Sequence, residues 1–373
     1  MTHYIKEFTV HDYKGIHELT LKDIAPINIL TGDNNSGKTS LLELLATTEN
    51  PLTVRTWLPA TRSGYSGYYG YYRNISIFEG FYYLFPCNQE EDKCVEYEWL
   101  DISNHTHRTQ IKGTVFNDQL SEEELKHIDG IRSTYRQTHL FQDIEYIDVN
   151  GLRIEISNNA KKTKFVIYNK QSRLPEASSR LLKNNSINFI TPADHEIYNK
   201  YINSVLKTTD YNPLLVEMLH YFDNEITGIQ AIQSEDIAGA ISYQILSKRH
   251  RQSLPLSAYG GGMKKAVLLL SALLQVQNGI LLIDEFETGI HTSCMDQVFS
   301  LLLENALKLN VQVFMTSHSK EAISKVLRLT QPEDIQKNIA LYTLYNYEGK
   351  NYVRRVDCQE AIEMEDKLGM ELR

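Results

Sequence analysis

The segment Gly32-Asp-Asn-Asn-Ser-Gly-Lys-Thr constrains the fold of this chain more than any other. It follows an apolar run over residues 27–30 and leads into a run of good helix formers that begins at Ser40. Between a strand and a helix, such a glycine-rich segment turns tightly enough for successive backbone N–H groups to point at one phosphate, and the helix N-terminus favours negative charge. The sequence therefore predicts a nucleotide phosphate site.

The side chains of this loop have separate expected roles. Lys38 is expected to reach the β- and γ-phosphates of ATP, and the hydroxyl of Thr39 is expected to ligate Mg²⁺. The candidate nucleotide-binding residues are Gly32, Asn34, Asn35, Ser36, Gly37, Lys38, Thr39 and Ser40. A purely structural glycine turn before a helix is the alternative, and the full motif in the right context argues against it.

A second apolar strand, over residues 280–283, ends in two carboxylates, Asp284 and Glu285. Charge at a buried strand end is costly unless it meets a cation or handles a proton. Asp284 is therefore expected to hold Mg²⁺ through Thr39 or water, and Glu285 to orient and deprotonate the attacking water. An acidic pair that caps a helix is the alternative interpretation.

Two further segments narrow the class of nucleotide hydrolase. A glycine-rich turn precedes an apolar helix predicted over 263–276 and forms a second candidate anion site. Its candidate residues are Ser257, Gly260, Gly261 and Gly262. Because one ATP has a single γ-phosphate, this turn is expected to serve the nucleotide of another subunit. His318 follows the strand predicted over 311–316 and is expected to hydrogen-bond the γ-phosphate and align the water.

Strands that alternate with helices at both ends of the chain predict an α/β fold with a parallel core sheet. The middle differs, because alternating runs predict an antiparallel sheet over about 90–170, with Asn150-Gly151 as a hairpin turn. A helical stretch over about 193–221 is expected to break at Pro213. No sustained heptad pattern predicts a long coiled coil.

These patterns predict four regions along the chain. Residues 1–50 and 235–350 are expected to form the ATPase core, and 51–185 a tyrosine-rich loop followed by an antiparallel β insert. Residues 186–234 are expected to form a strand and a helical lobe, and 351–373 a C-terminal strand and an acidic helix.

The order of lysine loop, glycine-rich turn, strand with Asp-Glu and strand-terminal His resembles the ATP-binding-cassette ATPases of the SMC/RecF/OLD kind. Three segments resemble in particular the stand-alone OLD-like AAA ATPases of anti-phage defence operons. They are Asp33-Asn-Asn-Ser-Gly-Lys-Thr-Ser-Leu-Leu-Glu, Ile283-Asp-Glu-Phe-Glu-Thr-Gly-Ile-His and Thr316-Ser-His-Ser. The resemblance covers about residues 1–50 and 186–330 and implies an ATP-binding-cassette-like head. It also implies Mg-dependent ATP hydrolysis in composite sites between two head-to-tail subunits, hence a homodimer or larger homo-oligomer.

Several positions depart from the family pattern. The signature serine has two candidates, Ser257 and the position of Tyr259. His291 stands where transporter-type cassettes carry an aspartate, which argues against a transporter motor. Gln110 is the weak candidate for the glutamine that links the two lobes. The short stretch after His318 leaves no space for the Toprim nuclease usual in OLD proteins, so a separate effector polypeptide is expected.

Composition bears on compartment and partners. No apolar stretch is long enough to cross a membrane, and 4 Cys in 373 residues form no disulfide framework, so a soluble cytoplasmic protein is expected. A net charge of −9 argues against wholesale nucleic-acid binding but leaves open a basic groove between subunits. The tyrosine-glycine cluster at 64–72 is expected to form a protein interface, to pack on itself or to stack on bases.

Two functional hypotheses follow. The first is an ATPase that dimerises around ATP and regulates a separate nuclease or toxin in anti-phage defence. The second is a RecF-like DNA-binding ATPase of DNA repair, whose dimer clamps a duplex. A transporter motor is disfavoured because the antiparallel insert and His291 do not fit it.

Overall fold

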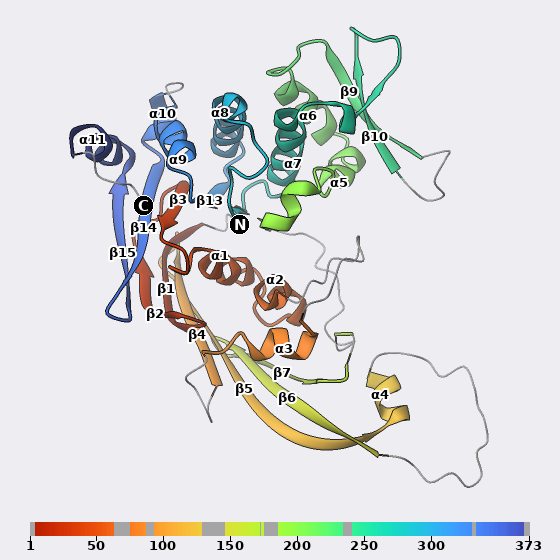
Figure 1. Cartoon of the computed structure of the whole chain (residues 1–373), viewed down its shortest axis with the longest axis vertical. Helices are drawn as coiled ribbons and strands as arrows, with labels where there is room; N and C mark the ends of the chain where they lie inside the picture. Colours follow the sequence, from red (N-terminus) through yellow and green to blue (C-terminus); the bar gives the residue numbers. More distant parts are fainter. Residues whose placement is uncertain are drawn as a thin grey trace.

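The computed structural model describes residues 4–62, 75–86, 93–128, 146–171, 173–174, 186–233, 241–329 and 333–368. Within these ranges the chain forms three β-sheets and the helices that cover them (Figure 1). The predicted α/β class, with a parallel core sheet, an antiparallel β insert and a helical lobe, is confirmed. The longest helix of the described residues is α8 (Thr292–Lys308) with 17 residues.

The core sheet contains the strand that leads into the phosphate loop and the strand that ends at Asp284 and Glu285. Its strands lie in the order β15 (Lys350–Asp357), β14 (Ile339–Tyr347), β3 (Ile27–Gly32), β13 (Gln312–Thr316), β12 (Ile280–Ile283) and β8 (Ile187–Ile190). All neighbours are parallel except β15, which pairs antiparallel with β14. Every residue of β3, β12 and β13 is buried, as expected for strands covered on both faces.

Helices cover both faces of this sheet. Leu30 and Phe314 pack with Leu41 of α1 (Lys38–Thr47) on one face. On the other, Ile29 and Val313 belong to the cluster that contains α7 (Gly261–Gln275), α8 and α9 (Lys320–Leu327). Figure 1 shows α7, α8 and α9 on the opposite side of the sheet from α1. The carboxyl ends of the parallel strands β3, β12 and β13 therefore open at one edge between the two helix layers.

The antiparallel sheet packs against α1. Its strands lie in the order β2 (Ile16–Leu21), β1 (Ile5–Tyr13), β4 (Lys93–Asp101), β5 (Thr106–Ser121), β6 (Tyr146–Asn158) and β7 (Lys161–Tyr168). Tyr97 and Trp57 are buried in the cluster that includes α1, and the Tyr97 hydroxyl lies 2.7 Å from the Thr47 hydroxyl. The long strands β5 and β6 extend away from the core (Figure 1).

The predicted hairpin at Asn150-Gly151 is wrong. Both residues lie inside β6, where Gly151 pairs with Phe116 on one side and Tyr168 on the other. A Cβ on Gly151 would come within 2.3 Å of the Phe116 ring, so the glycine makes room for a cross-strand aromatic side chain. A glycine in a strand marks a close approach here instead of a turn.

The predicted break at Pro213 is also wrong. The helical lobe contains η3 (Pro192–Glu196), α5 (Ile202–Lys207) and α6 (Tyr211–Leu219), and Pro213 lies in the first turn of α6. Proline is tolerated there because the first backbone N–H groups of a helix have no intrahelical partner. A three-stranded sheet follows, in the order β11 (Leu254–Pro255), β10 (Ile241–Ser247) and β9 (Ile226–Gln233).

Shorter elements complete the description. They are η1 (Val54–Trp57), α2 (Leu58–Thr61), α3 (Ile77–Tyr82), α4 (Glu122–Ile128), η4 (Leu256–Ala258), α10 (Glu333–Gln336) and α11 (Cys358–Leu368). The tyrosine-glycine cluster at 64–72 lies outside the described residues. Among the described helices, none has the length and apolar character needed to cross a membrane.

Candidate functional site: a nucleotide site at the end of the core sheet

The glycines of the phosphate loop are required by its backbone geometry. Gly32 has φ 136° and Gly37 has φ 97°, both in the region that side chains rarely adopt. A Cβ on Gly32 would lie 2.0 Å from the carbonyl oxygen of Leu344 on the neighbouring strand β14. Both the close approach of β3 to β14 and the tight turn into α1 therefore require glycine, which has no side chain.

No side chain caps the N-terminus of α1, the helix that follows the phosphate loop. Its N-cap, Gly37, is left-handed and offers no side-chain hydrogen bond, so the first N–H groups of the helix are available to an anion. Ser36 is buried, Asn34 and Asn35 are exposed at the tip of the loop, and Thr39 and Ser40 are half-buried on the first turn.

Lys38 is buried among oxygen atoms of its own loop. Its Nζ donates to the carbonyl oxygens of Gly32 at 2.8 Å and Asp33 at 2.7 Å, and to Ser36 Oγ at 3.2 Å. Burial lowers the pKa of Lys38 to about 8, against the opposing pull of Asp284 and other nearby carboxylates. Burial therefore disfavours the charged form of Lys38, and a bound anion would stabilise it.

Asp284 lies at the end of β12 with an exposed fraction of 1%. Its Oδ1 accepts from Thr316 Oγ1 at 2.5 Å, whereas Oδ2 is buried with no hydrogen-bond partner among the described residues. Burial raises the pKa of Asp284, and the hydroxyls of Thr316 and Thr39 oppose that rise. An unsatisfied carboxylate oxygen near a threonine hydroxyl is the donor set that Mg²⁺ prefers, so these residues fit that ion.

Glu285 follows in a left-handed conformation, with φ 50°. Its N–H donates to Thr316 Oγ1 at 2.8 Å, and its Oε2 accepts from Thr288 Oγ1 at 3.3 Å. Non-glycine residues with positive φ store strain and cluster at functional sites. Glu285 in this conformation lies on the wall of a cavity.

That cavity brings the loop and the carboxylates together. It has a volume of about 840 Å³, and Thr39, Asp284 and Glu285 lie on its wall together with residues of α2, η3 and α5. Sequence reasoning missed Glu43, which lines the cavity one helical turn after Thr39. Its buried carboxylate accepts from Lys14 at 2.7 Å and Arg62 at 2.6 Å. The helical spacing from Thr39 was the signal that would have identified it.

Glu287 is a second residue that sequence reasoning missed. Its Oε1 accepts from the backbone N–H groups of His318 at 3.1 Å and Ser319 at 3.2 Å, which ties the loop after β12 to the loop after β13. His318 itself is exposed. The parallel pairing of β12 with β13 brings His318 near the end of β12, and the hydrogen bonds of Glu287 hold the two following loops together.

The glycine-rich turn lies apart from this cavity and lines none of its wall. Ser257, Gly260 and Gly261 are exposed, Tyr259 is half-buried and Gly262 is buried against Cys294. The N-cap of α7 is Gly260, which provides no side-chain hydrogen bond. One chain therefore holds the phosphate loop and the carboxylates in one place and the second glycine turn in another.

Two weaker candidates have structural contacts of their own. Gln110 lies in β5 and donates to Glu96 Oε2 at 3.0 Å across the antiparallel sheet, and it does not line the cavity. His291 is the N-cap of α8, where its Nδ1 accepts from the N–H of Ser293 at 3.3 Å.

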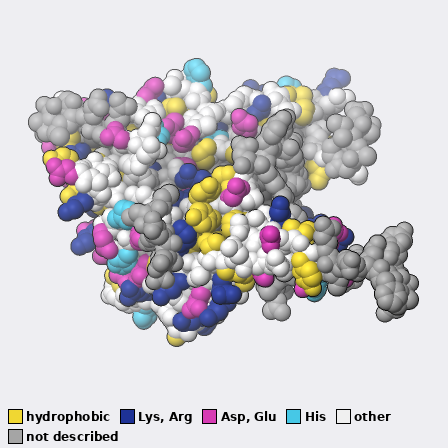
Figure 2. Space-filling model, turned by 60° about the horizontal axis from the view of Figure 1, so that its bottom comes forward, with side chains coloured by type: hydrophobic (Ala, Val, Ile, Leu, Met, Phe, Trp, Pro, Cys, Tyr) yellow, Lys and Arg dark blue, Asp and Glu magenta, His cyan; other side chains and the backbone are white. Residues whose placement is uncertain are grey.

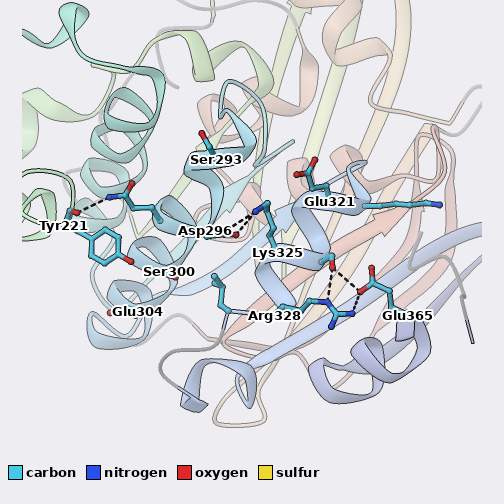
Figure 3. Close-up of a pocket in the computed structure, with 13 residues that line it drawn as sticks. Tyr221, Ser293, Asp296, Ser300, Glu304, Glu321, Lys325, Arg328 and Glu365 are labelled. Carbon is cyan, nitrogen blue, oxygen red and sulfur yellow. Dashed lines mark hydrogen bonds and ion pairs between the residues drawn. The ribbon is translucent and has the colours of Figure 1, made fainter. Parts of the chain in front are cut away.

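A second groove, of about 1040 Å³, lies between α8, α9 and α11 (Figure 3). Two of the cations that line it are already paired. Lys325 donates to Asp296 at 2.9 Å, and Arg328 donates to Glu365 at 2.8 Å. No residue of the phosphate loop and neither carboxylate of the Asp-Glu strand lines it. It is therefore not the nucleotide site.

Charges of both signs mix on the face of the molecule in Figure 2. On the antiparallel sheet, Glu155 accepts from Lys162 at 3.0 Å and from Lys164 at 2.6 Å, and these two cations lower its pKa to about 2. Arg108 pairs with Glu96 in the same sheet. These described basic side chains are thus partly neutralised where a phosphate backbone would need them free.

Comparisons with known proteins show the family of this chain. The family model described as "AAA domain, putative AbiEii toxin, Type IV TA system" matches residues 27–324, more than half of the chain. An "ATP/GTP phosphatase" of Helicobacter pylori is 25% identical over 91% of this chain and 92% of its own length. An uncharacterized protein of Methanocaldococcus jannaschii is 32% identical over 31% of this chain and 98% of its own length.

Solved structures of SMC heads match this chain at low similarity. An SMC head bound to the C-terminal winged-helix domain of ScpA covers 96% of this chain and 99% of its own, with 12% identity and a TM-score of 0.49. The SMC head domain from Thermotoga maritima covers 95% and 99%, with 13% identity and a TM-score of 0.45. The family model covers more than half of the chain and includes the phosphate loop. The chain therefore belongs to this AAA-domain family and is an ATPase of the AAA class.

Proposed function

We propose that this ATPase binds Mg-ATP at the loop over residues 32–40 and uses Glu285 as the base for hydrolysis. The observation that carries the proposal is the single cavity in which Thr39 of α1 meets Asp284 and Glu285 of the strand end. We further propose that the ATPase core comprises residues 1–50 and 235–350.

The residues of this chain divide the work of hydrolysis. Mg²⁺, held by Thr39 and Asp284, would supply charge neutralisation at the β- and γ-phosphates. The N-terminus of α1 and Lys38 bind and orient the phosphates. Glu285 accepts a proton from the attacking water, and His318 donates a hydrogen bond to the γ-phosphate. The products are ADP and inorganic phosphate.

Two substitutions test this assignment. Glu285→Gln should bind ATP with nearly unchanged affinity and lose hydrolysis by about 100-fold or more, because the amide cannot take the proton. Lys38→Ala should lose ATP binding, because the cations on the cavity wall, Arg62 and Lys200, are already paired with Glu43 and Asp194. Binding is measured by equilibrium titration and turnover by phosphate release. Full turnover by Glu285→Gln, or unchanged ATP affinity of Lys38→Ala, contradicts the proposal.

We also infer that two copies close head to tail around ATP. The exposed N-terminus of α7 at Gly260 and Gly261 lies outside the cavity of its own chain, and this separation supports a role at the nucleotide of a second copy. Glu285→Gln with ATP and Mg²⁺ should form a dimer in analytical ultracentrifugation. Gly261→Glu, which places a negative charge at the turn, should remain monomeric under the same conditions while still binding ATP.

The biological role we propose is regulation of a separate effector, a nuclease or toxin, in anti-phage defence. The OLD-like segments around Lys38, Asp284 and His318 support it, as does a family description that names a toxin system. Affinity purification of the tagged protein from its native operon should recover a neighbouring gene product. Salt-dependent DNA binding that ATP enhances, without a co-purified protein, would favour the RecF-like alternative instead.

A further inference from the structure

Lys265 is a buried lysine next to the loop that follows β12 and carries Glu285. It lies on the second turn of α7, after the glycine-rich turn, and its exposed fraction is 3%. Its Nζ lies 2.5 Å from His195 Nδ1 and 2.7 Å from the carbonyl oxygen of Thr288. Lysine is almost never fully buried unless its ammonium is well partnered, and these two partners come from η3 and from the loop after β12.

His195 continues this contact to Asp284. Its Nε2 lies 2.6 Å from the carbonyl oxygen of Asp284. A carbonyl oxygen only accepts, so Nε2 carries the proton and the unprotonated Nδ1 accepts from Lys265. Burial first, and the charge of Lys265 second, lower the pKa of His195 to about 4, which agrees with a neutral ring. The hydrogen bonds therefore run in one direction, from Lys265 through His195 to Asp284.

The two acceptors lie at the two ends of one short loop. This loop, residues 284–288, begins at Asp284, carries Glu285 in its left-handed conformation and ends at Thr288. Lys265 holds the far end directly and the near end through His195. The Thr288 hydroxyl in turn donates to Glu285 Oε2 at 3.3 Å. A strained base such as Glu285 needs its backbone fixed from both sides to keep one orientation.

We propose that Lys265 and His195 are positioning residues that hold the loop over residues 284–288 at both ends and tie it to the helix that begins at the glycine-rich turn. This inference rests on the proposed role of Glu285 as base. An apolar side chain of similar length would fill the site of Lys265 without the cost of burying an ammonium. Lys265 therefore contributes to the geometry of the loop more than to the stability of the fold.

The connection gives α7 a direct path to the base of its own subunit. Any ligand that contacts the exposed turn at Gly260 and Gly261 acts on a helix whose next turn carries Lys265. A shift of α7 would move the Thr288 carbonyl and, through His195, the Asp284 carbonyl. Closure of a second copy on the turn would thus be coupled to the orientation of Glu285 in the first.

Lys265→Met tests the proposal in the full-length protein. We expect kcat to fall by about 10- to 100-fold, the Kd for ATP to change by less than about threefold, and the Tm to stay equal or rise. The matched control is Lys264→Met, because Lys264 is the half-buried neighbour whose Nζ lies 5.7 Å from the centre of the Tyr198 ring. That control should keep the wild-type kcat.

Substitutions at His195 provide a second, independent test. His195→Leu should lower kcat as Lys265→Met does, whereas His195→Gln should retain most of the activity, because its amide offers one donor and one acceptor. The double variant should be no slower than the slower single variant if both residues act in one chain of hydrogen bonds. If Lys265→Met does not fold, the difference in kcat between His195→Leu and His195→Gln tests the proposal instead.

Three outcomes would overturn the inference: wild-type kcat in folded Lys265→Met, a loss of Tm in parallel with kcat, or fully additive effects in the double variant. Glu285→Gln is measured in the same assay to separate the two proposals. If Glu285→Gln is inactive while Lys265→Met is fully active, only the positioning role fails. If Glu285→Gln remains active, the proposed role of Glu285 fails.

Discussion

Thr316 donates from its hydroxyl to Asp284 Oδ1 at 2.5 Å. Thr316 Oγ1 also accepts from the backbone N–H of Glu285 at 2.8 Å, so one buried side chain at the end of β13 holds both carboxylate residues at the end of β12. The parallel pairing of β12 with β13 puts these strand ends side by side. Thr316 thereby sets which oxygen of Asp284 remains without a hydrogen-bond partner among the described residues.

Thr316→Val should lower kcat by about 10- to 100-fold, because valine has the shape of threonine but neither donates to Asp284 nor accepts from Glu285. Thr316→Ser, which keeps the hydroxyl, should restore most of the activity. Both are measured by steady-state phosphate release, with the Kd for ATP determined separately. Equal activity of the valine and serine variants would show that the hydroxyl has no part in hydrolysis.

Gly32→Ala should lower the free energy of unfolding by about 3 kcal/mol or more, because the added Cβ meets Leu344 O at 2.0 Å and φ is 136°. Gly260→Ala is the matched control. A Cβ there meets nothing within 4 Å and φ is −64°, so the change should stay within about 0.5 kcal/mol. Urea unfolding of both variants measures the difference. Similar stability of the two variants would contradict the close approach of β3 to β14.

The affinity for ATP should fall as the pH rises above 8. The pKa of Lys38 is lowered to about 8 by burial, and a bound polyphosphate raises it, because the anion favours the charged amine. Binding therefore takes up a proton above pH 8, and affinity declines by up to about tenfold per pH unit there. Isothermal titration at pH 7 to 9.5 in buffers of different ionisation enthalpy measures both the affinity and the proton uptake. Constant affinity with no proton uptake would rule out this titration.

Asp101 should make the fold sensitive to acid. The pKa of Asp101 is lowered from 3.8 to about 2, first by the backbone N–H of His105 and then by the side chain of His107. A lowered pKa contributes stability that is present above about pH 4 and is lost as the pH falls toward 2. The Tm deficit of Asp101→Asn should thus be full at pH 7 and shrink toward pH 3.

Exposed Glu123→Gln on α4 serves as the control for charge removal alone. The difference in Tm between Glu123→Gln and the wild type should not shrink between pH 7 and pH 3. A deficit of Asp101→Asn that stays constant from pH 7 to pH 3 would mean that the carboxylate makes no such contribution.

Much of the site was predictable because its signals are local. The glycines, Lys38 and Thr39 are recognisable from a segment whose backbone geometry permits few residues, and Asp284 and Glu285 stand out as charges at the end of an apolar strand. Local signals also misled. Asn150-Gly151 has turn chemistry, but pairing with strands on both sides and the ring of Phe116 keep it extended.

The sequence by itself determined the phosphate loop, the carboxylate pair and the alternation of strands and helices, because each depends on neighbours along the chain. Only the tertiary structure decided that Thr316 supports Asp284, that Glu43 shares the cavity with Thr39, and that Lys265 reaches His195. These contacts join residues from different elements. A threonine, a glutamate or a lysine carries no mark of its partner until the packing of the sheets and helices brings the two together and excludes water from between them.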